Sequence, residues 1–201
     1  MIFIIIFSII KIIPNNLKIY FIDVGQGDSC LIVTPSNKKI LIDGGGSENY
    51  DVGKNTLLPY LLDRRINNLD YVIISHFDTD HVGGIIYLMQ NIKIKNVIIS
   101  KQFESTENLE KIYSIAQKQK LNVQIVQAGD KVNIEKNVYF DIIWPVSENM
   151  ISENAINNNS VVCKLNYYIF SMIYYIYESY LRLYRRQDFR EHTNRGHRKF
   201  T

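Results

Sequence analysis

Four metal-binding side chains lie within residues 75–84, whose sequence is Ser-His-Phe-Asp-Thr-Asp-His-Val-Gly-Gly. They belong to His76, Asp78, Asp80 and His81. Imidazole combined with carboxylate suits zinc, manganese or iron(II) better than calcium, which prefers oxygen ligands throughout. Two of these residues are two positions apart and the other two are adjacent, so a tight loop lets the pairs diverge toward two ions. The pattern predicts a centre for divalent metal ions.

The elements around this stretch should place the ligands at the end of a strand. An apolar run at 69–74 predicts a buried strand, and Gly83-Gly84 precedes a segment, 85–90, that we expect to be helical. The ligands would then lie on the connecting loop, where backbone can curl around an ion. The alternative is a solvated polar loop with Asp80 as the cap of the following helix.

The remaining pattern predicts an α/β fold in which strands and helices form layers. Short apolar or alternating runs predict strands at 17–24, 29–34, 39–42, 96–100, 122–126, 131–134, 138–144 and 160–165. Two helices are expected, at 56–65 and at 106–119. Their predicted inward faces consist of Leu57, Leu58, Leu61 and Leu62 in the first helix and Leu109, Ile112, Tyr113 and Ala116 in the second.

Several segments together resemble a known family. Residues 76–81 resemble the His-x-His-x-Asp-His signature of the metallo-β-lactamase superfamily, with Asp78 in place of the second histidine. Residues 21–29 (Phe-Ile-Asp-Val-Gly-Gln-Gly-Asp-Ser), 41–46 (Leu-Ile-Asp-Gly-Gly-Gly) and 158–162 (Asn-Asn-Ser-Val-Val) are similar to the hydrolase domain of the ComEC-type DNA-uptake family. The resemblance extends from about residue 17 to about residue 170. It implies an αββα sandwich with metal ions at the ends of the sheets.

The resemblance also implies roles for the ligands. His76 and Asp78 would hold one ion, and Asp80 and His81 a second, in a centre for zinc or manganese. Asp80 would also position the attacking water and is the predicted catalytic residue. The carboxylate at position 78 hardens the first site, which shifts its preference toward manganese.

Five further residues are candidates for supporting the site or contacting substrate. By resemblance, Asp43 braces the metal loop rather than leading the coordination, and Asp28 is placed with it. For both, the alternative is an aspartate that forms a turn next to glycine. Asn158, Asn159 and Ser160 either support the site or form a turn.

The end of the sequence departs from the family pattern. The family continues with a Thr-Gly-Asp strand end and a His-His-Gly-Ser loop, and neither occurs after residue 170. Six of the seven basic residues in 182–201 are arginine, whereas two of the other sixteen are. We expect an incomplete domain with an aberrant tail produced by a frameshift or gene break. A membrane-anchoring tail at 165–181 is the alternative, and His192 and His197 are expected to be solvated.

The first thirteen residues are nearly all isoleucine and phenylalanine and precede Pro14. They predict an export signal or membrane anchor, hence a membrane-associated or secreted protein, although a core strand, compatible with the cytoplasm, remains the alternative. The expected organisation is a hydrophobic segment at 1–16, a hydrolase domain at 17–170 and a tail at 171–201.

Composition limits the function. Residues 182–201 carry seven basic and two acidic side chains, against sixteen and eighteen elsewhere, so the domain lacks a generally basic DNA-binding surface. Cys30 and Cys163 lie in apolar runs and are expected to be buried thiols. The resemblance predicts a metal-dependent phosphodiesterase acting on single-stranded DNA. A hydrolase of another ester, such as a lactone or phosphocholine ester, and a non-catalytic remnant with weak metal binding are the alternatives.

Overall fold

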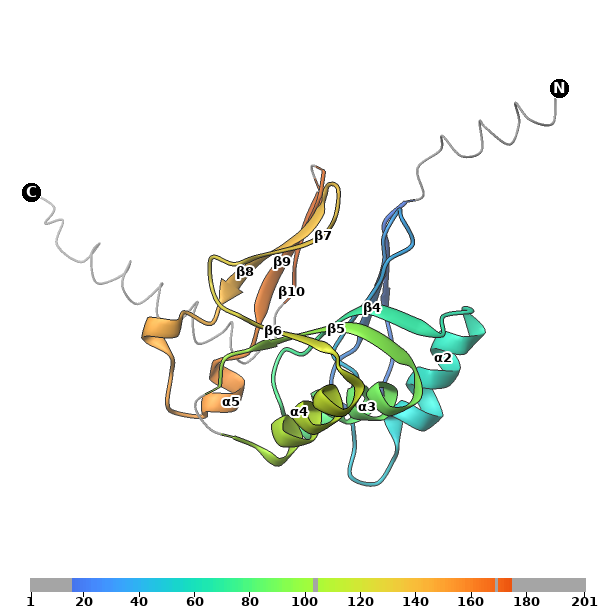
Figure 1. The fold of residues 1–201 in the computed structure, drawn as a ribbon, viewed down its shortest axis with the longest axis horizontal. Helices are drawn as coiled ribbons and strands as arrows, with labels where there is room; N and C mark the ends of the chain where they lie inside the picture. Colours follow the sequence, from blue (N-terminus) through green and yellow to red (C-terminus); the bar gives the residue numbers. More distant parts are fainter. Residues whose placement is uncertain (1–15, 103–104, 169, 175–201) are drawn as a thin grey trace, which may run out of the picture.

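The computed structural model describes residues 16–102, 105–168 and 170–174, which form two sheets packed against each other (Figure 1). The first sheet has six strands in the order β1-β2-β3-β4-β5-β6, which is also their order along the chain. Its strands are β1 (Lys18–Phe21), β2 (Cys30–Val33), β3 (Lys39–Ile42), β4 (Asn68–Ile73), β5 (Lys93–Ser100) and β6 (Asn122–Val126). The first three are antiparallel, and β3 to β6 are parallel, so the carboxyl ends of the last four meet at one edge.

The second sheet has four strands in the order β10-β9-β8-β7, all antiparallel. They are β7 (Lys131–Glu135), β8 (Val138–Trp144), β9 (Val162–Tyr167) and β10 (Phe170–Tyr174). The strand β10 pairs with β9 in register, so residues 170–174 extend this sheet.

Helices cover the face of the first sheet that points away from the second (Figure 1). They are the π-helical turn η1 (Gly53–Leu57) and the α-helices α2 (Leu58–Asp63), α3 (Thr79–Asn91) and α4 (Glu107–Gln119). Pro59 lies in the first turn of α2, where its missing N–H costs nothing. Between β8 and β9 lie the 3-10 turn η2 (Ser147–Asn149) and the short helix α5 (Ala155–Asn158).

Strand alternation divides the interior into two apolar layers. In β2 and β3, Leu31 and Leu41 point toward the helices, while Ile32 and Ile42 point toward the second sheet. The second layer also contains Phe140 from β8. Because side chains alternate with a period of two, one strand can supply both layers. The predicted mixed α/β fold is confirmed as helices on one sheet and that sheet on another.

Four details of the prediction were wrong. The helix α3 begins at Thr79, not after the glycine pair, so Asp80 and His81 lie in its first turn. Residues 53–63 form a π-helical turn followed by α2 rather than one helix at 56–65. Leu62 and Tyr113, expected inside, are 51% and 41% exposed.

Both cysteines are buried free thiols in the layer between the sheets, as predicted. Burial, with a smaller contribution from the charge of Asp43, raises the pKa of each thiol to about 12. These cysteines are therefore packed as small apolar groups rather than reactive nucleophiles.

Residues 1–15 and 175–201 lie outside the described part of the chain, so the predicted leader or anchor and most of the predicted tail, with His192 and His197, lie outside it too. None of the helices in the described ranges combines the length and apolar character that a bilayer crossing requires. The sandwich implies a further helical layer outside the second sheet. In the described part of the chain, the 3-10 turn η2 and the four-residue helix α5 are the helical elements that follow β8.

Candidate metal centre

The centre is built where β3 and β4 end. These strands are parallel, so Asp43, directly after β3, reaches Ser75, just beyond the end of β4. The backbone N–H of Ser75 donates to Asp43 Oδ1 at 2.8 Å, and the Ser75 hydroxyl donates to Oδ2 at 2.5 Å. Asp43 is fully buried and adopts a left-handed backbone with φ of 55°. A carboxylate thereby joins the two strand ends.

Glycines let the first turn of α3 sit close to this edge. A Cβ on Gly27 would lie 1.5 Å from the carbonyl oxygen of Asp80, and one on Gly84 would lie 2.1 Å from that of Gly44. The Gly44 N–H donates to the His81 carbonyl at 2.8 Å. The glycine pair inside α3 therefore serves close helix–loop packing, since any side chain there would push the ligands outward.

Three of the predicted ligands form one cluster. His76, Asp80 and His81 each offer one ligand atom, and these atoms lie within 4.8 Å of one another. The two imidazole rings are 4.0 Å apart between centroids. Each histidine also faces a carboxylate: His76 Nε2 lies 3.5 Å from Asp78 Oδ2, and His81 Nε2 lies 3.9 Å from Asp80 Oδ2. The structure brings His76 together with Asp80 and His81 and leaves Asp78 outside this cluster, while the predicted division of the four ligands between two ions stays a prediction.

Asp43 orients both imidazoles through their Nδ1 atoms. His81 Nδ1 lies 3.1 Å from Asp43 Oδ2, and since a carboxylate only accepts, this nitrogen carries the proton. The Ser75 hydroxyl uses its hydrogen on Asp43, so His76 Nδ1, 3.1 Å from Ser75 Oγ, must donate to it. In the neutral rings both Nε2 lone pairs then face the acidic side chains, which is the tautomer that metal binding requires.

Electrostatics follow from these contacts. Burial lowers the pKa of His81, but the hydrogen bond to Asp43 and the charges of Asp43, Asp80 and Asp28 outweigh it, so the pKa lies above the ordinary 6.5. The neighbouring His76 imidazole, followed by the Asn157 amide, holds the pKa of Asp78 below its ordinary value despite burial. Two lone pairs facing two carboxylates favour a proton or a metal cation between them.

The other predicted residues lie around this group. Asp28 is exposed, and its carbonyl accepts from the Gly45 N–H at 3.0 Å. Asn158, Asn159 and Ser160 are buried, and their side chains bond to backbone carbonyls of residues 151–157. These three side chains therefore hold the loop before β9 in shape rather than pointing at the ligand cluster.

Sequence reasoning missed three residues. Ser75 links Asp43 to His76, as described above. In α4, Asn108 Nδ2 donates to the Phe77 carbonyl at 2.9 Å. Asn157 Nδ2 donates to Asp78 Oδ2 at 2.8 Å. Ser75 and Asn157 adjoin recognised motifs, so nearness to those motifs was the available signal, whereas nothing in the sequence distinguished Asn108.

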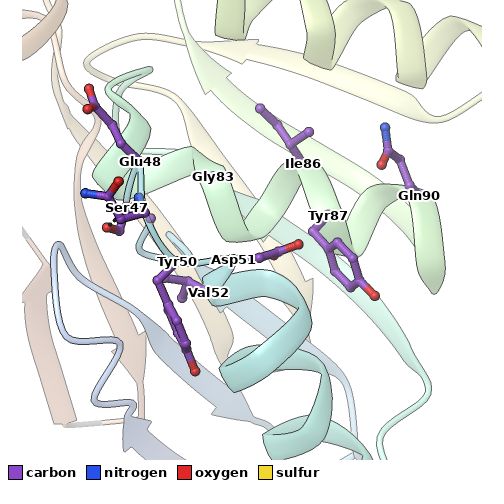
Figure 2. Close-up of a pocket in the computed structure, with 11 residues that line it drawn as sticks. Ser47, Glu48, Tyr50, Asp51, Val52, Gly83, Ile86, Tyr87 and Gln90 are labelled. Atoms are coloured by element: carbon purple, nitrogen blue, oxygen red, sulfur yellow. Dashed lines mark hydrogen bonds between the residues drawn. The ribbon is translucent and has the colours of Figure 1, made fainter.

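Several pockets open beside the metal-binding loop, and two of them share residues 46–49. One has a volume of about 420 Å3 and is lined by Asp78, Thr79 and Asp80 on one side and the loop 46–49 on the other. The second, of about 530 Å3, shares that loop and continues past Tyr50 and Asp51 to Tyr87 and Gln90 on α3 (Figure 2). The smaller pocket reaches Asp78 and Asp80, and both pockets are lined by the loop 46–49.

The residues present fit a divalent transition metal. Two imidazole nitrogens and a carboxylate oxygen form a donor set typical of zinc, manganese or iron(II) sites, and Asp78 can add a second carboxylate. The partner that orients each imidazole is in place, as such sites require.

Comparison with known proteins agrees with this geometry. Residues 22–153 match the family model described as "Metallo-beta-lactamase superfamily". A metallo-beta-lactamase from Cronobacter sakazakii, a HARLDQ motif mutant, superposes with a TM-score of 0.52 at 19% identity, covering 78% of this chain and 60% of that one. At that identity the superposition speaks for the fold alone. The chain belongs to the metallo-beta-lactamase superfamily.

Two curated relatives share part of the sequence. ComE operon protein 3 of Bacillus subtilis is 31% identical over 158 residues, which are 72% of this chain and 20% of that protein. Endoribonuclease ysh1 of Schizosaccharomyces pombe is 32% identical over 81 residues, 38% of this chain and 10% of that protein. The chain therefore spans a fifth or less of the length of these relatives.

Proposed function

We propose that the chain is a metal-dependent phosphodiesterase acting on single-stranded DNA. The observation that carries this proposal is the cluster of His76, Asp80 and His81, whose ligand atoms lie within 4.8 Å of one another and whose imidazoles are oriented through Asp43. The similarity to ComE operon protein 3 supports the DNA-uptake context, and that to an endoribonuclease supports phosphodiester chemistry.

The residues divide the work. A bound divalent ion lowers the pKa of a water toward neutrality and stabilises negative charge on phosphoryl oxygens. His76 and His81 hold their Nε2 lone pairs toward the cluster, Asp80 orients the attacking water, and Asp43 keeps both rings in place. Outside residues 182–201, acidic residues outnumber basic ones by eighteen to sixteen, so net charge does not attract the phosphodiester. Substrate affinity should depend on the metal.

Hydrolysis assays test the proposal. Because the Thr-Gly-Asp and His-His-Gly-Ser segments of the family do not occur in the sequence, the 201-residue chain should cleave single-stranded DNA and bis-p-nitrophenyl phosphate only slowly with added manganese or zinc, and it should lose this activity in EDTA. Asp80→Ala should abolish turnover, whereas Asp63→Ala, which removes an exposed carboxylate 84% accessible to solvent, should not. Metal binding without any metal-dependent hydrolysis would make the chain a non-catalytic binding domain and sink the hydrolase assignment.

A second candidate is hydrolysis of an ester with a cationic head group, such as a phosphocholine ester. The larger pocket favours it, because Glu48 and Asp51 line that pocket together with Tyr50 and Tyr87 (Figure 2). Acidic and aromatic side chains together suit a quaternary ammonium group. p-Nitrophenylphosphorylcholine turned over faster than bis-p-nitrophenyl phosphate, with the preference lost in Tyr87→Ala, would favour this substrate over DNA.

A further inference from the structure

Asn157 contacts the metal-binding loop from a distant part of the chain. Its side-chain Nδ2 donates to Asp78 Oδ2 at 2.8 Å across 79 residues of sequence. The same oxygen lies 3.5 Å from His76 Nε2. The amide hydrogen bond therefore fixes the one ligand candidate that lies outside the three-residue cluster.

Asn157 lies in the short helix α5, and several hydrogen bonds hold the segment around it in place. Ser160 Oγ donates to the Asn157 carbonyl at 2.5 Å. Asn159 accepts from Ile151 N at 3.0 Å and donates to the Ile151 carbonyl at 2.8 Å. The Trp144 indole donates to the Asn158 carbonyl at 2.6 Å. The side chains of residues 158–160 all form hydrogen bonds with backbone groups. Their effect is therefore to hold Asn157 in the position from which it reaches Asp78.

The segment 157–161 forms a second hydrogen bond with the metal-binding loop. The Val161 N–H donates to the Ser75 carbonyl at 2.7 Å. Residues 157 and 161 thus bond on either side of His76, one to residue 78 and one to residue 75. Strands β8 and β9 of the second sheet flank this segment, so the packing of the two sheets sets the position of Asp78.

We propose that Asn157 is a positioning residue, which orients the Asp78 carboxylate so that it joins His76 on a metal ion. An amide suits this role, because its N–H donates to a carboxylate that only accepts, whereas a carboxylate at position 157 would repel Asp78. The proposal rests on the metal centre of the proposed function but not on the substrate.

Metal titration tests it in the full chain. Manganese binding measured by calorimetry should weaken about tenfold in Asn157→Ala, as expected for loss of a residue that orients a ligand. Asn149→Ala, an exposed asparagine in the same connection, is the matched control and should bind as the wild type does. Asn157→Ser, whose hydroxyl is too short to reach Asp78, replaces the alanine variant if that variant does not fold.

A double-mutant cycle separates positioning from a general structural role. In an Asp78→Ala background, Asn157→Ala should cause no further loss of affinity. Equal losses in both backgrounds, or no loss in the wild-type background, would overturn the positioning role while leaving the metal centre intact. A wild-type chain that binds no manganese would overturn both the positioning role and the proposed function.

Discussion

Asp43 and Asp70 are buried carboxylates on neighbouring strands of one sheet, at opposite ends. Asp70, near the start of β4, accepts from the Lys39 backbone N–H at 2.9 Å and from Lys95 Nζ at 2.7 Å, joining β3, β4 and β5. Asp43, beyond the end of β3, accepts from Ser75 and His81. Each carboxylate links adjacent strands, yet their partners differ in kind.

That difference separates a structural site from a functional one. At Asp70 an ammonium group of the chain supplies the positive charge. At Asp43 the partner is an imidazole whose other nitrogen faces Asp80, so the contact leads on to further acceptors. Burial alone therefore does not mark a carboxylate as functional. The informative feature is whether its hydrogen-bond partner has a second polar atom that faces other ligand candidates.

The largest difference in metal affinity should come from removing the partner of each carboxylate, His81 beside Asp43 and Lys95 beside Asp70. His81→Ala should weaken manganese or zinc binding by more than about 100-fold, because it removes a ligand. Lys95→Ala should leave the affinity unchanged. Calorimetric titration of both variants measures this contrast, and equal weakening would mean that the ends are not functionally distinct.

Changing the carboxylates themselves should give the next largest effect. Asp43→Asn should lower metal affinity roughly 10–100-fold, because the amide cannot accept from every donor now bonded to it and the imidazoles lose their orientation. Asp70→Asn is the matched substitution, and its affinity should equal that of the wild type. A full-affinity Asp43→Asn protein would show that the histidines are oriented without it.

For the stability of the metal-free chain, Asp70 should be the carboxylate whose replacement has a clear effect. Asp70→Asn should lower the free energy of unfolding of the metal-free chain by about 1–2 kcal/mol, since it weakens two hydrogen bonds, one of them to a half-exposed lysine. Thermal or urea unfolding measures the loss. If stability is unchanged, the lysine contact is a surface pair of negligible weight.

The smallest effect is a difference in pH dependence. Lys95 and the Lys39 N–H hold the pKa of Asp70 below its ordinary 3.8 although burial opposes them, so its stabilisation is present above that value and is lost as pH falls through the folded pKa. His81 has a raised pKa, so its stabilisation is full below 6.5 and is lost as pH rises through the folded value.

Melting temperatures of the metal-free chain between pH 3 and 8 test both signs. Asp70→Asn should reduce the fall in melting temperature at acidic pH, and His81→Gln should reduce the fall near neutral pH. Metal binding needs a neutral His81, so protection by manganese should increase with pH where the metal-free stability falls. Parallel trends would contradict the assigned direction for His81.

The strands were predictable from sequence because short apolar or alternating runs reflect a strand that is buried on both faces, as in β3, or on one, as in β8. The predicted ranges for β3, β6 and β8 match the observed ones, and the ligands were visible through their residue types and spacing. The start of α3 was not predictable. Gly83 and Gly84 lower helix propensity locally, and only the approach of the loop 44–46 explains why they lie inside a helix.

The support of the site was harder to predict than its ligands. Asp43 and the segment 158–160 were recognisable by resemblance, but the sequence does not show that Asn157 rather than its neighbours reaches Asp78. That contact depends on how β8 and β9 pack on the first sheet, which is a property of the folded chain. The predicted burial of Tyr113 and Leu62 was wrong for a similar reason. Helical periodicity identifies the apolar side of a helix but not where the buried part of that side ends.

The order of the strands has a consequence for synthesis. All six strands of the first sheet precede the four of the second along the chain, so they are synthesised and leave the ribosome first. His76, Asp80 and His81 thus emerge well before Asn157. Until β7 to β10 follow, the nascent sheet exposes an apolar face that includes Ile32, Ile42 and Ile98. The pace of translation across residues 131–174 therefore sets how long that face stays open to aggregation.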